Sequence, residues 1–82
     1  MLASVRNLRT SEIELRQRLP ELEGDWLVGR LRAKRGIADA EYGSGARRLV
    51  VEYDADVLGS ADLIGFLDDW GIPVAAVHSA RA

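Results

Sequence analysis

The sequence predicts an α+β fold, a two-layer sandwich with a four-stranded antiparallel sheet and two helices on one of its faces. Two runs, Ile37–Tyr42 and Leu49–Tyr53, alternate in the two-residue period of strands and flank the turn Gly43-Ser44-Gly45, so they predict a hairpin. Apolar residues at helical spacing follow between Leu63 and Trp70. The predicted order is strand–helix–strand–strand–helix–strand, and right-handed crossovers then place the first and third strands centrally.

The first strand is the most ambiguous element. Apolar and charged residues alternate from Ile13 onward, which indicates a strand that ends at Pro20. Ser11 and Glu14 have the spacing of a helix capping box, so a helix is the rival interpretation. We favour the strand, because without it the sheet would contain only a hairpin and one edge strand.

The first helix is expected to begin at Gly24 or Asp25, to run to about Lys34 and to end at Gly36. Its inward-facing residues are expected to be Leu27, Val28 and Leu31.

The second helix has clearer end signals. Ser60 is a favourable N-cap, Asp62 suits the positive end of the helix dipole, and Gly71 can end the helix. The last strand is expected over Ile72–Val77. It contains Pro73, which cannot donate to a strand ladder, so the strand belongs at a sheet edge or has Pro73 at its start.

Length and composition indicate one domain over residues 1–82, with 1–10 and 79–82 as loose ends. The chain is 48% hydrophobic and can therefore bury a core without a disulfide or structural metal. It contains no cysteine, which excludes thiolate metal sites and thiol nucleophiles and fits a cytoplasmic location. No apolar run approaches the roughly 20 residues of a membrane span, so no direct membrane insertion is expected.

Several segments between Glu12 and Val77 match one known family in both order and residue type. They are Gly36-Ile37, Arg48–Asp54, Ser60–Ile64 and Trp70-Gly71-Ile72. In these features the chain resembles the heavy-metal-associated domain, the ferredoxin-like module of copper chaperones and metal-pumping ATPases. The stretch Leu19–Asp25 is more similar to a degenerate branch of the family, found near the N-termini of some cation ATPases. The resemblance implies a ferredoxin-like fold and a binding or regulatory role related to metal transport.

The chain departs from the family at the metal site. The metal-binding branch has two cysteines three positions apart in the loop after the first strand, and these hold a soft ion as thiolates. The corresponding positions here are Pro20 and Glu23. The sequence therefore predicts a domain without the thiolate site of the family.

Two hypotheses of function remain. The first is a non-catalytic module that docks onto a protein partner, such as a cation transporter or another copy of the chain, through the edge strand with Ala38, Ala40 and Tyr42. The alternative is cation binding through carboxylates of the loop after the first strand. Its candidate ligands are Glu21, Glu23 and Asp25. A good oxygen site needs about six ligands, so we favour a structural explanation, in which Asp25 caps the helix and the two glutamates solvate a loop near its positive end.

Other chemistries have weaker signals, and neither a cofactor nor nucleic acid is expected. Arg30–Arg35 and Arg47-Arg48 could form a basic patch, but the net charge is −2 and the central strands lack the aromatic pair that stacks RNA bases. His78 is the only histidine and has no partner in the sequence. No arrangement of residues suggests an enzyme, and Trp26 and Trp70 are expected mainly in the core.

Overall fold

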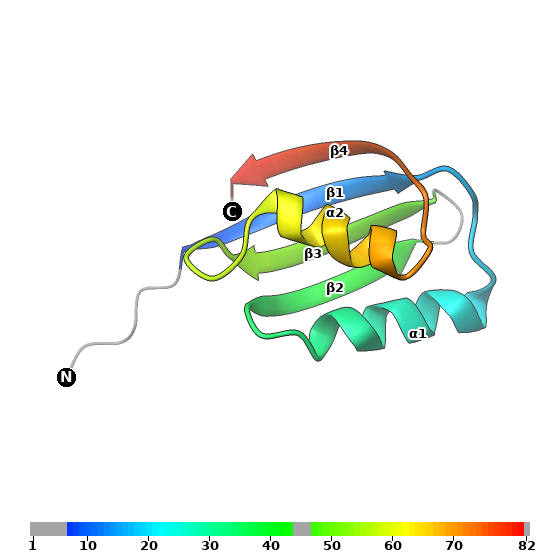
Figure 1. Ribbon diagram of the computed structural model, residues 1–82, viewed down its shortest axis with the longest axis horizontal. Coiled ribbons are helices and arrows are strands. Elements are labelled where there is room, and N and C mark those ends of the chain that lie inside the picture. Colours follow the sequence, from blue (N-terminus) through cyan, green and yellow to red (C-terminus); the bar gives the residue numbers. More distant parts are fainter. Residues whose placement is uncertain (1–6, 44–46, 82) are drawn as a thin grey trace.

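The computed structural model describes residues 7–43 and 47–81 of the chain. Its elements follow the order β1 (Leu8–Leu15), α1 (Glu21–Arg32), β2 (Ile37–Gly43), β3 (Arg48–Asp54), α2 (Ser60–Asp69) and β4 (Val74–Arg81) (Figure 1). The strands form one antiparallel sheet in the order β2-β3-β1-β4. The predicted ferredoxin-like α+β fold is therefore confirmed, with β1 and β3 central and β2 and β4 at the edges.

The core lies between the sheet and the two helices. The central strands contribute alternate residues to it, namely Ser11, Ile13 and Leu15 from β1 and Leu49, Val51 and Tyr53 from β3. The helices cover them with Leu27, Leu31, Leu63 and Leu67. Full burial of such an aliphatic side chain is worth about 1.5–3 kcal/mol, so this alternation fixes which face of each strand meets the helices.

The ends of the chain depart from the prediction. β1 begins at Leu8 and ends at Leu15, so it includes residues 8–10 and stops well before Pro20. β4 begins at Val74, after Pro73 rather than at Ile72, and extends to Arg81, so residues 79–81 belong to a strand rather than to a loose end. The reason is mutual pairing, because Arg9 of β1 registers with both Tyr53 of β3 and Arg81 of β4. Residues 1–6 and 82 lie outside the described residues.

Helix α1 begins earlier than predicted. Its N-cap is Pro20, whose φ of −57° suits a helix start, and the Gly24 N–H donates to the Pro20 carbonyl at 2.9 Å. Asp25 therefore lies inside the helix and does not cap it, while Glu21 and Glu23 occupy the first turn. The helix ends at Arg32, and Gly36, with a φ of 93°, completes the turn into β2.

Helix α2 is capped differently from the prediction. Its N-cap is Gly59, and the Asp62 carboxylate accepts the Gly59 N–H at 2.8 Å. Ser60 instead places its hydroxyl 3.2 Å from the hydroxyl of Tyr53. Gly71, with a φ of 74°, ends the helix as predicted.

The two helices are joined by an aromatic cluster. The Trp26 and Trp70 rings meet edge to face with centroids 6.1 Å apart, and the Arg30 guanidinium lies 5.2 Å and 4.9 Å from their centroids. Phe66 stacks on Trp70 at 6.0 Å. Trp26 is 45% exposed, so it is not the core residue that the sequence suggested but part of the outer surface of the helix layer.

Candidate protein-binding groove

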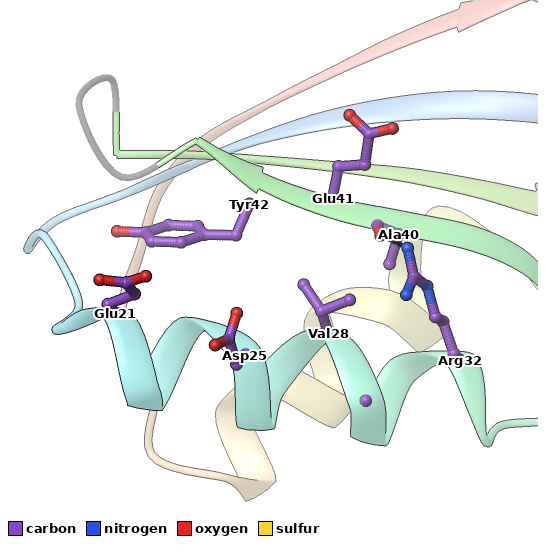
Figure 2. Close-up of a pocket in the computed structure, with 8 residues that line it drawn as sticks. Glu21, Asp25, Val28, Arg32, Ala40, Glu41 and Tyr42 are labelled. Carbon is purple, nitrogen blue, oxygen red and sulfur yellow. Dashed lines mark hydrogen bonds between the residues drawn. The ribbon is translucent and has the colours of Figure 1, made fainter.

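A groove of about 730 Å³ runs between helix α1 and the edge strand β2 (Figure 2). Its helix wall is formed by Glu21, Asp25, Val28, Gly29 and Arg32, and its strand wall by Ala40, Glu41 and Tyr42. The groove follows an edge strand of the sheet, the type of place where extended peptides bind.

The helix wall results from residue spacing. Glu21, Asp25 and Arg32 lie four and seven positions apart and therefore project from one side of α1, which faces β2. On the strand, Ala40 and Tyr42 face the helix, while Glu41 points away from it and forms the outer rim (Figure 2). The carboxylates thus occupy both sides of the strand edge.

One end of the groove is closed by a contact between Tyr42 and α1. The Tyr42 hydroxyl accepts the Leu19 N–H at 2.8 Å, and its ring lies so close to Gly24 that an added Cβ would be 2.6 Å from the ring. A side chain at Gly24 would force the strand and helix apart. Glycine at this helix position is therefore a packing requirement.

The middle of the β2 edge is covered by two side chains, Arg32 and Asp39. Arg32 donates through Nη2 to the Ala40 carbonyl at 3.0 Å and through Nε to Asp39 Oδ1 at 3.0 Å. The same Asp39 oxygen accepts the Ala40 N–H at 2.9 Å. Both backbone groups of Ala40 are thus bonded by side chains, an arrangement that protects an edge strand from uncontrolled pairing. We call this pair the Arg32–Asp39 clip.

The groove is electrostatically negative. The ion pairs among residues 7–43 and 47–78 join Arg32 to Asp39 and Arg48 to Glu12. Within that part of the chain, Glu21, Asp25 and Glu41 therefore have no basic partner within 4.0 Å. Three carboxylates beside an edge strand favour a cationic ligand of extended shape.

The predicted carboxylate ligands are not all brought together. Glu21 and Asp25 both line the groove, but Glu23, two positions along α1 from each, is not among the lining residues. In the described ranges, no group of three or more His, Cys, Asp or Glu residues is arranged to hold a metal ion.

The predicted edge residues all lie on β2, but the register with β3 shifts between Ile37 and Asp39, so Ala38 lies at an irregularity of the strand. Ala38 is exposed, Ala40 is buried and Tyr42 is partly buried, all on β2. Sequence reasoning missed the Arg32–Asp39 clip, because Arg32 was grouped with its basic neighbours. That basic patch is not formed as one surface, since the end of α1 and the start of β3 lie at opposite ends of the sheet (Figure 1).

Comparisons with protein-family models, with curated proteins and with solved structures found no match. In the described part of the chain, no helix has the length and apolar character needed to cross a membrane.

Proposed function

We propose that this domain is a non-catalytic docking module that binds an extended, basic segment of a partner protein in the groove between α1 and β2. One observation carries the proposal: carboxylates without basic partners flank an edge strand, with Glu21 and Asp25 on the helix side and Glu41 on the outer side.

The binding mode would be strand addition. A peptide strand beside β2 directs alternate side chains to opposite faces of the sheet. Basic side chains on one face would reach Glu21 and Asp25, and those on the other would reach Glu41, since directly opposed residues lie about 4.5–5.5 Å apart. A second copy of β2 fits poorly here, because antiparallel pairing would bring Asp39 and Glu41 close to the same residues of the copy.

Binding requires the Arg32–Asp39 clip to open. Both side chains are about half exposed, at 54% and 52%, and an exposed ion pair contributes only about 0–1 kcal/mol. The clip can therefore yield to a partner strand that replaces its bonds to Ala40. In the free domain the clip covers the β2 edge, and opening it costs little free energy.

The partner class follows from this chemistry and from the family resemblance. The groove favours lysine or arginine at alternate positions of an extended segment. The resemblance to a degenerate heavy-metal-associated domain favours a cation transporter as the protein that carries such a segment.

A peptide titration followed by backbone NMR tests the proposal. The probe is a synthetic peptide that alternates arginine and valine, and the control is the same peptide with glutamate in place of arginine. We expect the basic peptide to shift the amides of Ala38–Gly43 and of the Glu21–Arg32 helix. Shifts confined to other parts of the chain, or equal shifts with both peptides, would contradict the proposal.

A matched pair of variants sharpens the test. Gly29 lines the groove and Gly65 lies on α2, and neither has any atom within 4 Å of an added Cβ. Lysine at either position improves helix propensity equally, but only Gly29→Lys adds a cation to the groove. Gly29→Lys should weaken peptide binding about tenfold or more, while Gly65→Lys should leave it unchanged.

A further inference from the structure

The backbone of β2 directs its bonding groups alternately toward β3 and toward the open edge of the sheet. Ala40 registers with Val51 of β3. Its N–H and C=O, however, bond to the side chains of Asp39 and Arg32. Ala40 and Val51 therefore form a non-hydrogen-bonded pair, and both groups of Ala40 face the edge. Tyr42 lies two positions further along the same regular ladder, so its N–H and C=O face the edge as well.

The Arg32–Asp39 clip occupies the groups of Ala40 as one residue of an antiparallel strand would. In an antiparallel ladder, one residue of the neighbouring strand both accepts the N–H and donates to the C=O of the residue that it faces. The clip bonds the same two groups, through an Asp39 oxygen at 2.9 Å and an Arg32 nitrogen at 3.0 Å. The described strands also pair antiparallel with one another. An added strand is therefore expected to run antiparallel to β2, with one of its residues opposite Ala40.

The side chains of such a strand alternate between the two faces of the sheet. The residues opposite Ala40 and Tyr42 direct their side chains to the helix side, because directly opposed residues share a face. The residue between them, opposite Glu41, directs its side chain to the open face. Three successive positions of the added strand thus have three different surroundings.

The helix-side position opposite Tyr42 is acidic. Figure 2 shows the carboxylates of Glu21 and Asp25 on α1 at the end of the groove where Tyr42 lies. Over residues 7–43 and 47–78, neither carboxylate has a basic partner within 4.0 Å. A lysine or arginine at this position can therefore pair with them.

The helix-side position opposite Ala40 is apolar and lies beside a cation. Val28 points from α1 toward β2 here, and the Arg32 guanidinium lies 3.0 Å from the Ala40 carbonyl oxygen. When the clip opens, Arg32 stays on the helix wall of the groove and repels a second basic side chain. A valine can instead pack against Val28. This position therefore favours an apolar residue.

The open-face position opposite Glu41 is acidic again. Glu41 points away from α1 and lines a hollow of about 220 Å³, which Glu52 of β3 also lines. Glu52 lies between two buried residues of β3 and therefore points to the open face. It registers with Asp39, so two acidic residues oppose each other across the strands, an arrangement that a cation stabilises. A basic residue is therefore favoured opposite Glu41 as well.

We propose that the groove recognises two neighbouring basic residues followed by an apolar residue, in a segment that runs antiparallel to β2. In the chain order of the partner, the first basic residue lies opposite Tyr42, the second opposite Glu41 and the apolar residue opposite Ala40. This specificity rests on the proposed function, to which it adds direction and register. A peptide with arginine only at alternate positions meets the carboxylates of one face at a time, whereas a neighbouring pair meets those of both faces.

Two peptides of identical composition test the proposal. One carries Arg-Arg-Val and the other Val-Arg-Arg, each between Ser-Thr-Ser flanks with blocked termini, so their net charges are equal. Backbone NMR titration of the full chain gives both affinities. We expect Arg-Arg-Val to bind about fivefold or more tightly. The reversed peptide places valine beside the carboxylates of Glu21 and Asp25, and arginine beside Arg32.

A matched pair of variants locates the preference. Glu21→Gln and Glu23→Gln remove the same charge from the first turn of α1, but only Glu21 lines the groove. Glu21→Gln should lower the ratio of the two affinities by about twofold or more, and Glu23→Gln should leave the ratio unchanged. Glu41→Gln should weaken both peptides alike, because each places an arginine opposite Glu41.

The position of the bound valine is a second readout. Its methyl groups should show nuclear Overhauser contacts with those of Val28, and contacts with the Tyr42 ring instead would overturn the register. Tighter binding of Val-Arg-Arg would overturn the antiparallel direction, since a parallel strand reverses the order. Equal binding of both peptides in the groove would overturn the specificity and leave the proposed function standing. Binding of neither peptide at β2 would overturn both.

Discussion

At the scale of single residues, the contact between Gly24 and Tyr42 shows how one absent side chain sets the distance between α1 and β2. Glycine inside a helix normally costs about 0.5–1 kcal/mol relative to alanine. Here the cost is offset, because the Tyr42 ring occupies the space that a Cβ would need. The same ring carries the hydroxyl that accepts the Leu19 N–H.

Gly24→Ala is expected to lower the free energy of unfolding by about 1–3 kcal/mol, because a Cβ 2.6 Å from the ring overpacks this contact. Gly65→Ala is the control in α2, where nothing lies within 4 Å, and it should raise the free energy of unfolding by about 0.5–1 kcal/mol. Urea denaturation measures both. Equal effects of the two substitutions would show that the ring contact does not determine the choice of glycine.

At the scale of elements, periodicity predicted the β2–β3 hairpin and both helices, whereas β1 was assigned because the sheet needed a further strand. The ends of the elements depended on particular residues. The alternation of Leu49, Val51 and Tyr53 predicted β3 and its buried face, both of which the structure confirms. The predicted start of α1 was wrong, because Pro20 can begin a helix as well as end a strand. The predicted N-cap of α2, Ser60, was wrong as well, because the Asp62 carboxylate accepts the N–H of Gly59, one residue earlier.

The candidate groove could be predicted in part. The β2 edge and the acidic residues near the start of α1 were both identified from sequence. Their meeting in one groove was not, because it depends on α1 starting at Glu21 and on the helix face that turns toward β2. The Arg32–Asp39 clip depends on the geometry of the turn at Gly36, for which the sequence offers no periodic signal.

Among the described residues, the two glycines with positive φ, Gly36 and Gly71, both lie in turns and allow a matched prediction. Gly71 has a φ of 74° with open space around it. Gly71→Ala should therefore lower the free energy of unfolding only by what alanine loses in the left-handed conformation, about 1–2 kcal/mol. Gly36 has a φ of 93°, and an added Cβ would lie 2.8 Å from Val57. Gly36→Ala should therefore be the more destabilising, by a further 1–3 kcal/mol or so. The midpoints of thermal unfolding of the two variants test this. A lower midpoint for Gly71→Ala than for Gly36→Ala would contradict this account of the Gly36 turn.

Loss of one partner of the Arg32–Asp39 clip gives a further prediction at the scale of elements. Asp39→Ala removes the acceptor of the Ala40 N–H, so hydrogen exchange of that amide should become faster. The free energy of unfolding should change by no more than about 1 kcal/mol, because the ion pair is exposed. The same variant should bind the arginine–valine peptide more tightly than the unsubstituted chain. Unchanged exchange at Ala40 would mean that Asp39 does not cover the edge.

At the scale of the whole molecule, the two edges of one sheet differ in electrostatics. The β2 groove is acidic, and the β4 edge is neutral from Val74 to His78. Peptide binding at β2 should therefore weaken steeply as added salt shortens the screening length from about 30 Å at 0.01 M to about 3 Å at 1 M. A peptide titration across a salt series measures this effect, and an affinity that does not change with salt would contradict the electrostatic account of the groove.

The aromatic cluster between the helices gives the molecule a built-in optical probe. The chain has two tryptophans, and both belong to this cluster, where they meet at 6.1 Å. Their emission spectrum therefore reports on the surroundings of the α1–α2 contact. Separation of the helices would expose the partly buried Trp70 and shift its emission toward longer wavelengths, so unlabelled protein suffices to follow opening of the helix layer in real time.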